Sequence, residues 1–125
     1  MTPREVINSF RDMYPNQFGD DTLTGWIAEL EGCVISDVIL THEGAPDGAS
    51  SFGGISLADA DTYRLFAGAP HGRIYADYLR MMCDEARGDT ARYRDSSEIF
   101  YSSFADFADA YNRAHMPLGV RELTV

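Results

Sequence analysis

The chain has 125 residues, of which 45% are hydrophobic and 12% aromatic, and this composition is typical of one folded domain covering residues 1–125. It carries 20 acidic and 10 basic residues, a net charge of −10, and every basic residue is an arginine. This balance disfavours tight binding of nucleic acids or anionic membranes, which depends on cations, and it excludes chemistry that requires a lysine.

The first helix is predicted to begin at Thr2 and Pro3, because a hydroxyl cap followed by proline is a typical helix start. Apolar residues then recur at helical spacing until Pro15, which ends the helix. This N-terminal stretch is too polar for a signal peptide, and no apolar run approaches the roughly 20 residues that cross a bilayer. We therefore expect a cytosolic protein without a membrane partner.

A second helix is predicted to follow a cap at Asp20 or Asp21, and its apolar stripe continues to Ile39. Gly32 lies inside this helix, where a glycine costs on the order of 1 kcal/mol relative to alanine. Either a closely packed neighbour or a break in the helix near Gly32 would explain the glycine.

Residues 41–54 have the composition of a loop, and residues 55–66 alternate apolar and polar side chains in two short runs. The alternation predicts a β-hairpin or an extended arm. Because two strands alone are marginally stable in water, such an arm needs a surface to lie on. We therefore predict that residues 45–66 contact a second copy of the chain through their apolar side chains: Phe52, Ile55, Leu57, Tyr63, Leu65 and Phe66.

A third helix is predicted from about Gly72 to Ala86, with Gly88 well placed to end it. A fourth helix, capped by Asp89 or Asp95, would reach residue 114 and span roughly 37 Å. Its apolar seam steps by three or four residues through Tyr93, Ser97, Phe100, Phe104, Phe107 and Tyr111. The expected fold is mainly α, a four-helix domain with a long C-terminal helix and a β-hairpin or extended arm between the second and third helices.

The residue types that most often carry chemistry do not form a catalytic or metal-binding pattern. The histidines are widely separated and the two cysteines lie fifty positions apart, so no ligand spacing is present: His42, His71, His115, Cys33 and Cys83. We interpret both cysteines as small buried apolar residues. No enzyme activity, metal or cofactor is expected.

Acidic residues cluster between the third and fourth helices, at Asp84, Glu85 and Asp89. Paired carboxylates can serve as acid–base groups or as ligands of hard cations. Because arginines alternate with these acids, a solvated surface of ion pairs is the favoured interpretation.

The segment YNRAHMPLG, residues 111–119, ends the last predicted helix. Proline stops a helix, and the polar residues before it are typical of a helix end. We predict that this segment fastens the helix end and presents the tail to a partner, through Asn112, Arg113, His115 and Met116.

Several segments of the chain are similar to one protein family: VINSFRDMYPNQF, TLTGWIAELEGCVISDVILTHEG, IYADYLRMMCDEARGDTARYRDS and YNRAHMPLG. They resemble the small head–tail connector proteins of tailed bacteriophages and prophages, also called neck or head-completion adaptor proteins. The pairing of ILTHEG with YNR-x-HMP is the most specific part. The chain departs from the family at APHGR, residues 69–73, and in the glycine-rich stretch before Ile55.

The resemblance implies a small, mostly helical structural protein without catalytic residues. Such proteins form a closed homo-oligomeric ring, of about twelve copies in the assembled particle, below the portal protein. The ring extends the DNA channel toward tail or stopper proteins, and an acidic lining would let DNA pass by repelling it. The expected location is the virion, with the host cytoplasm during assembly. A prophage in a bacterial genome is the alternative carrier of the gene.

A different class is a small acidic phage protein that mimics DNA or otherwise inhibits a host protein. DNA mimicry requires carboxylates in phosphate-like rows on one face. Here the acids are interleaved with apolar residues and with arginine, which disfavours that class. The size of the particle in solution separates the two hypotheses, because an inhibitor would be a discrete monomer or dimer.

Overall fold

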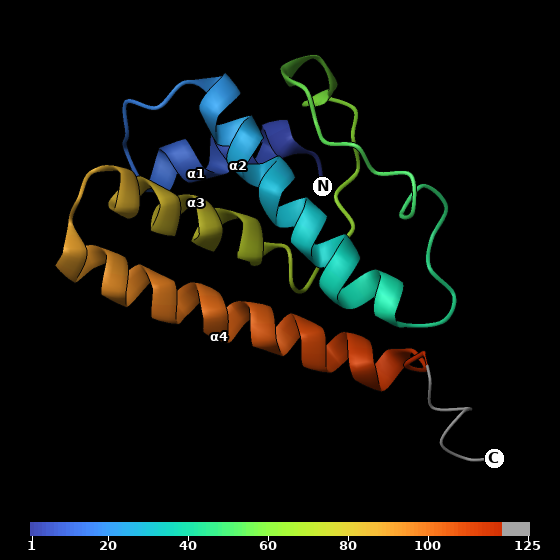
Figure 1. Cartoon of the computed structure of the whole chain (residues 1–125). Helices are drawn as coiled ribbons and strands as arrows, with labels where there is room; N and C mark the ends of the chain where they lie inside the picture. Colours follow the sequence, from blue (N-terminus) through green and yellow to red (C-terminus); the bar gives the residue numbers. More distant parts are fainter. Residues whose placement is uncertain (119–125) are drawn as a thin grey trace.

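The computed structural model of the chain describes residues 1–118 and is mainly helical, as the sequence predicts (Figure 1). Within this part of the chain there is no strand, and the α-helices are α1 (Pro3–Met13), α2 (Asp20–Cys33), α3 (Arg73–Ala86) and α4 (Thr90–Ala114). Shorter helical turns cover Val34–Val38, Ile39–Thr41 and Leu57–Asp59. The predicted four-helix architecture with a long C-terminal helix is confirmed.

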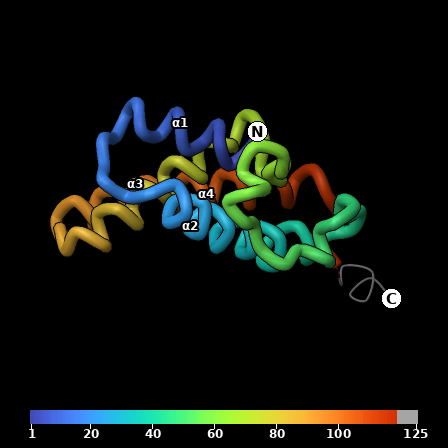
Figure 2. The backbone as a smooth tube through the Cα atoms, turned by 90° about the horizontal axis from the view of Figure 1, so that it is seen from above, coloured from blue at the N-terminus to red at the C-terminus, as the bar shows by residue number. Residues whose placement is uncertain are grey.

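Helix α3 is the centre of the molecule and contacts α1, α2 and α4. Seen from above in Figure 2, α1 and α2 lie on opposite sides of the α3–α4 pair. Buried side chains accordingly point in several directions around α3: Ile74, Tyr75, Leu79, Met81, Cys83 and Asp84. None of the helices in residues 1–118 is long and apolar enough to cross a membrane, including the 25-residue α4.

A short connection reverses the chain between α3 and α4. Gly88 has a φ of +70°, in the left-handed region that favours glycine, and it ends α3 as predicted. Asp89 then caps α4, because its Oδ1 accepts a hydrogen bond from the backbone N–H of Arg92 at 3.1 Å. The two helices therefore pack as an antiparallel pair.

Helix α2 is tied to α1 by one carboxylate. The predicted cap at Asp20 or Asp21 is wrong, because Gly19 occupies the cap position and Asp20 is the first helical residue. The Asp20 side chain accepts instead from Arg4 Nη1, at 2.7 Å, and from Arg11. These two guanidinium groups hold the pKa of Asp20 below its ordinary value. The acid thus links two helices.

The second predicted helix does not continue unchanged to Ile39. The α-helix ends at Cys33, and Val34–Val38 form a wider π turn whose apolar residues are buried. Of the two predicted alternatives, the break near Gly32 is therefore present. A Cβ added at Gly32 would lie 3.9 Å from the ring of Phe52, an ordinary contact, so no close packing requires a glycine there.

The predicted β-hairpin is absent, and residues 45–66 follow an irregular path with one 3₁₀ turn, Leu57–Asp59. Their backbone groups pair with the N-terminus instead of with a second strand. The N–H of Arg4 donates to the carbonyl of Ala60, and the N–H of Leu65 donates to the carbonyl of Met1, both at 2.9 Å. Alternation alone predicted two strands, but no ladder forms between the two runs.

The same segment belongs to the core of its own subunit. Five of the six predicted interface residues are buried or pack against the core: Phe52, Ile55, Tyr63, Leu65 and Phe66. Of the six, Leu57 is the exposed one, with 43% of its surface accessible. The premise that this segment needs a partner to be buried is therefore wrong. An interface role remains a prediction for the six residues, of which Leu57 is the most exposed.

The apolar seam of α4 packs on α3 much as predicted. Phe100 and Phe107 are buried, with 5% and 6% of their surface exposed, and Phe104 between them is partly buried. One position differs, because Ser96 is buried instead of the predicted Ser97. The Ser96 hydroxyl donates a hydrogen bond across the α3–α4 interface, which makes a polar residue acceptable there.

Replacing Phe100 by alanine should lower the free energy of unfolding by about 3–5 kcal/mol, because the truncation leaves a cavity between α3 and α4. Urea denaturation followed by circular dichroism measures the effect. Tyr101→Ala is the matched control, since Tyr101 is 61% exposed. Equal losses of unfolding free energy in the two variants would show that Phe100 does not lie on the face of α4 that packs on α3.

Candidate functional site

Two segments that are far apart in the sequence meet at one end of the molecule. We call this contact the C-terminal joint and define it by His42, Tyr111, Asn112 and His115. His42 follows the 3₁₀ turn Ile39–Thr41 and is only 6% exposed, whereas the other three belong to the end of α4. The joint unites the ILTHEG and YNRAHMP segments.

Both ring nitrogens of His42 are occupied. Nδ1 lies 2.6 Å from the carbonyl oxygen of Val38 and therefore donates to it. Nε2 lies 2.5 Å from the side-chain oxygen Oδ1 of Asn112. A ring held at both nitrogens is a structural group and not a general base.

Aromatic stacking and backbone hydrogen bonds complete the joint. The rings of Tyr111 and His115 are stacked, with centroids 3.8 Å apart and planes 11° apart, and His42 meets Tyr111 edge-on at 5.0 Å. The N–H of Glu43 donates to the carbonyl of Met116 at 2.8 Å. These contacts fasten the end of α4 to the segment after α2.

The structure brings together two of the four predicted helix-end residues, Asn112 and His115. Arg113 and Met116 point into solvent, and Met116 is 51% exposed. The predicted fastening of the helix end is therefore present. The predicted presentation of the tail concerns residues beyond 118, which lie outside the described part of the chain.

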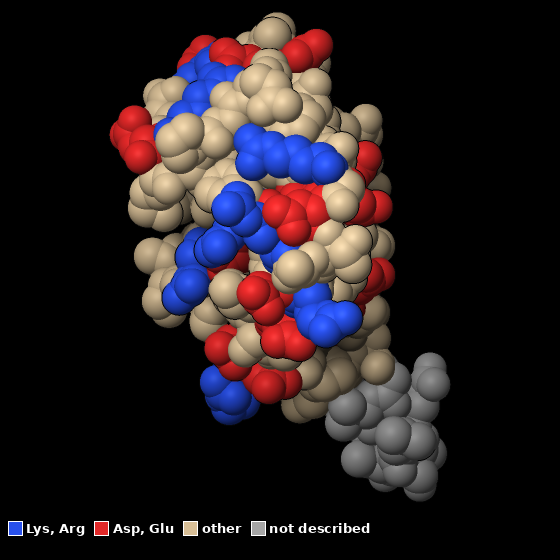
Figure 3. Space-filling view, turned by 90° about the vertical axis from the view of Figure 1, so that its left-hand side faces the viewer, with Lys and Arg blue, Asp and Glu red and all other residues tan. Residues whose placement is uncertain are grey.

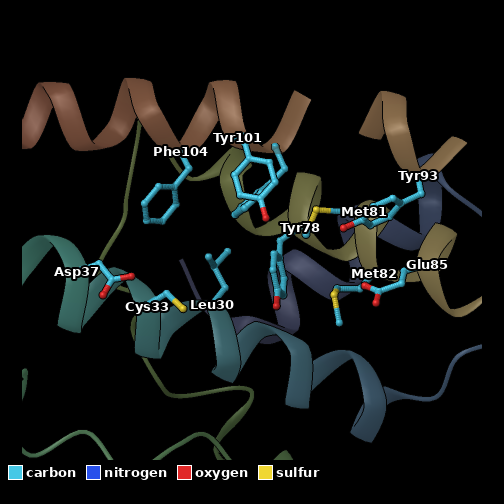
Figure 4. Close-up of a pocket in the computed structure, with 11 residues that line it drawn as sticks. Leu30, Cys33, Asp37, Tyr78, Met81, Met82, Glu85, Tyr93, Tyr101 and Phe104 are labelled. Atoms are coloured by element: carbon cyan, nitrogen blue, oxygen red, sulfur yellow. The ribbon is translucent and has the colours of Figure 1, made fainter. Parts of the chain in front are cut away.

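A groove of about 430 Å³ opens between α2 and α4, with α3 as its floor (Figure 4). We call it the acidic groove. Its apolar lining comes mainly from Tyr78, Met81, Met82, Tyr101 and Phe104.

Two exposed carboxylates, Asp37 and Glu85, are the charged residues among those that line the groove. Cys33 also lines it and is exposed, so the prediction that both cysteines are buried holds only for Cys83. Burial of the sulfur, with the nearby Asp37 and Glu29, raises the pKa of the Cys33 thiol. A thiol with a raised pKa is a weak nucleophile at neutral pH. The groove therefore combines an apolar lining with two carboxylates and one thiol of raised pKa.

A buried carboxylate that the sequence analysis did not single out, Glu31, joins three parts of the chain. Oε1 accepts from the hydroxyl of Tyr75 on α3 at 2.6 Å, and Oε2 accepts from the backbone N–H of Phe66 at 3.0 Å. The Tyr75 hydroxyl also accepts from the N–H of Ala67 at 3.1 Å. Burial raises the pKa of Glu31 above its ordinary value, and the two hydrogen bonds oppose that shift.

Asp84 is a second buried carboxylate, and the prediction that it lies on a solvated surface is wrong. It accepts hydrogen bonds from the hydroxyl of Tyr14 on α1 and, at 2.8 Å, from that of Ser96 on α4. Glu85 is exposed and Asp89 is a helix cap, so the three acids have three different roles. Asp84 holds α1, α3 and α4 together.

No protein-family model, curated protein or solved structure matches the chain. In the part of the chain that the structure describes, no three histidine, cysteine or carboxylate side chains gather in a way that could hold a metal ion. Two features of the described residues, the C-terminal joint and the acidic groove, are used in the proposal that follows.

Replacing Asn112 by alanine should lower the free energy of unfolding by about 1 kcal/mol, because the buried Nε2 of His42 loses its partner. The loss should be local, so amide hydrogen exchange should quicken in the last turn of α4. The exposed neighbour Arg113, changed to alanine, serves as the control and should stay within about 0.5 kcal/mol of the wild type. Unchanged exchange in Asn112→Ala would show that the joint does not fasten α4.

The raised pKa of Glu31 makes stability depend on pH. Below the ordinary value of 4.5 the carboxyl is protonated in both the folded and unfolded states, and nothing is lost. As the pH rises above 4.5, the unfolded chain releases its proton first, so folding becomes less favourable until the folded carboxyl also ionises. The free energy of unfolding of the wild type, minus that of Glu31→Gln, should therefore fall as the pH rises above 4.5. A difference that rises with pH would show that the carboxylate is stabilised as the anion.

Proposed function

We propose that the chain is a structural subunit of the neck of a tailed bacteriophage or prophage. Copies of it form a closed ring of about twelve subunits between the portal protein and the tail or stopper proteins, and DNA passes through the ring. The protein acts in the virion and, during assembly, in the host cytoplasm. It works through its surfaces and has no catalytic role.

The C-terminal joint is the observation that carries this proposal. The two most specific segments of the family resemblance contain His42 and Asn112, whose side chains are 2.5 Å apart although 70 positions separate them in sequence. A matched pair of motifs that forms a structural joint supports a resemblance in fold. Both nitrogens of His42 are used to hold backbone and side chain, which fits a structural role for the motif.

The charge and the acidic groove add independent support. A net charge of −10 disfavours tight adhesion to DNA, as a channel subunit requires. The groove offers apolar surface such as Tyr101, 61% exposed, of the kind that an assembled particle covers. A DNA mimic would not need such a groove.

The test is a deletion of the gene in the phage or prophage that encodes the chain. We expect filled or empty heads without attached tails in electron micrographs, and complete particles when the wild-type gene is supplied from a plasmid. A plasmid carrying Asp47→Asn, a change in an exposed loop, should rescue equally and controls for expression. Complete necks in the deletion strain would contradict the proposal.

A second measurement addresses the competing class. The purified chain should form a ring-sized complex when mixed with the portal protein encoded beside it, as judged by sedimentation velocity. A chain that stays monomeric or dimeric with the portal protein, and instead binds a host DNA-binding protein stoichiometrically, would establish the inhibitor function.

A further inference from the structure

An exposed basic and apolar surface lies on the side of α3 where α1 packs. We call it the arginine face and define it by Met13, Tyr14, Arg80 and Arg87. Met13 is the most exposed of the large hydrophobic residues in residues 1–118, at 74%, and it borders a shallow pocket with Tyr14 and Arg80. Both guanidinium groups lie 5.5 Å from the centroid of the Tyr14 ring.

The two arginines of this face have no acidic partner within the described residues. The ion pairs there involve Arg4, Arg11, Arg73 and Arg92 instead. Arg87 donates only to neutral oxygens, among them the carbonyl of Pro15 at 3.4 Å. Figure 3, which looks at the end of the molecule formed by the turns after α1 and α3, shows several Arg side chains there, with Asp and Glu side chains between them.

Two carboxylates near the arginine face, Asp77 and Asp84, are already engaged. Asp84 accepts from Tyr14 and Ser96. Asp77 lies 3.2 Å from Arg73 and accepts from Ser103 at 2.9 Å. Arg80 and Arg87 are therefore free to pair with carboxylates of another molecule.

The acidic groove has the complementary character and lies on another side of the same helix. Along α3, Arg80 is two residues from Tyr78, which places the two side chains about 200° apart around the helix axis. Tyr78 faces the groove between α2 and α4, and Arg80 faces the pocket beside α1. A contact between these two surfaces in different molecules is heterologous, because the two molecules contribute different surfaces. Each molecule then keeps its other surface free for a further copy.

The geometry points to a head-to-tail contact in which the arginine face of one copy docks into the acidic groove of the next. Met13 enters the apolar lining, and Arg80 and Arg87 meet the carboxylates Asp37 and Glu85. Repetition of a heterologous contact closes a ring where the rotation permits it. This inference rests on the proposed ring-forming function and names the surfaces that build the ring.

Cysteine crosslinking tests the contact directly, because Cys33 already lines the acidic groove. The full-length variant Met13→Cys is treated with a short bis-maleimide, both as the free chain in concentrated solution and mixed with the portal protein. The reaction is run at mildly alkaline pH, because the raised pKa of Cys33 leaves little thiolate at neutral pH. We expect a ladder of covalent dimers, trimers and larger species in denaturing gels, since each copy carries both reactive positions. Cys83 is buried and should not react with the maleimide.

Two controls show whether the ladder is specific. Adding Cys33→Ser to Met13→Cys should abolish it. A cysteine at Ile99, 39% exposed on α4 and beside a different pocket, should give no ladder. A product that stops at the dimer indicates a symmetric contact and overturns the inference, as does an Ile99→Cys ladder equal to that of Met13→Cys.

Charge reversal gives a second, independent measurement in the Met13→Cys background. Arg80→Glu and Glu85→Arg should each lower the crosslinked fraction by about fivefold, the factor that a favourable exposed ion pair contributes. Arg64→Glu and Glu98→Arg make the same charge changes at exposed positions outside both surfaces and should leave it unchanged. Equal effects of all four reversals would show a response to net charge only and would contradict the docking.

The outcomes separate this inference from the proposed function. If the chain forms rings with the portal protein but no crosslinked ladder appears in either sample, the proposed contact is contradicted. The proposed neck function is then unaffected. A ladder from the free chain without any portal complex supports the contact and counts against the neck function. If neither the crosslinked ladder nor the portal complex forms, the proposed contact and the proposed neck function are both contradicted.

Discussion

One buried carboxylate determines where the longest irregular segment of the chain lies. Glu31 on α2 accepts from Tyr75 on α3 and from the backbone of Phe66, and the Tyr75 hydroxyl in turn accepts from Ala67. An unpaired buried carboxylate is costly, so these donors must be present whenever the core is formed. The 31-residue interval between the 3₁₀ turn at Ile39–Thr41 and α3 is thereby held against α2 without any strand pairing.

The sequence allowed the helices to be predicted because helical periodicity depends on local spacing. α1, α3 and α4 begin and end within a residue or two of their expected bounds. The hairpin was predicted wrongly because alternation in residues 55–66 does not say whether a second strand is available to pair. Here the N-terminus supplies the hydrogen-bond partners, and these are more than fifty positions away in sequence.

The polar groups that matter most were the hardest to recognise. Asp84 stands among arginines, as surface acids do, and only the fold shows that Tyr14 and Ser96 surround it. Glu31 lies four residues after Ile27 and therefore on the core face of α2, a signal that periodicity could have given. The contact between His42 and Asn112 joins positions that the family resemblance had paired, but their distance could come only from the structure.

The π turn at Val34–Val38 makes the length of its own segment critical. A π turn is an α-helical stretch that holds one additional residue, and it lies between two fixed points, Glu31 and His42. Because each residue of a π turn rotates the chain by less than an α-helical residue does, the turn absorbs the additional residue and keeps the orientation of His42 relative to Glu31. A further residue inserted into the α-helical part would rotate the histidine by about 100°, away from Asn112, so such insertions should be rare in the course of evolution. The exposed loop at residues 44–48 has no such orientation to maintain and is free to change in length.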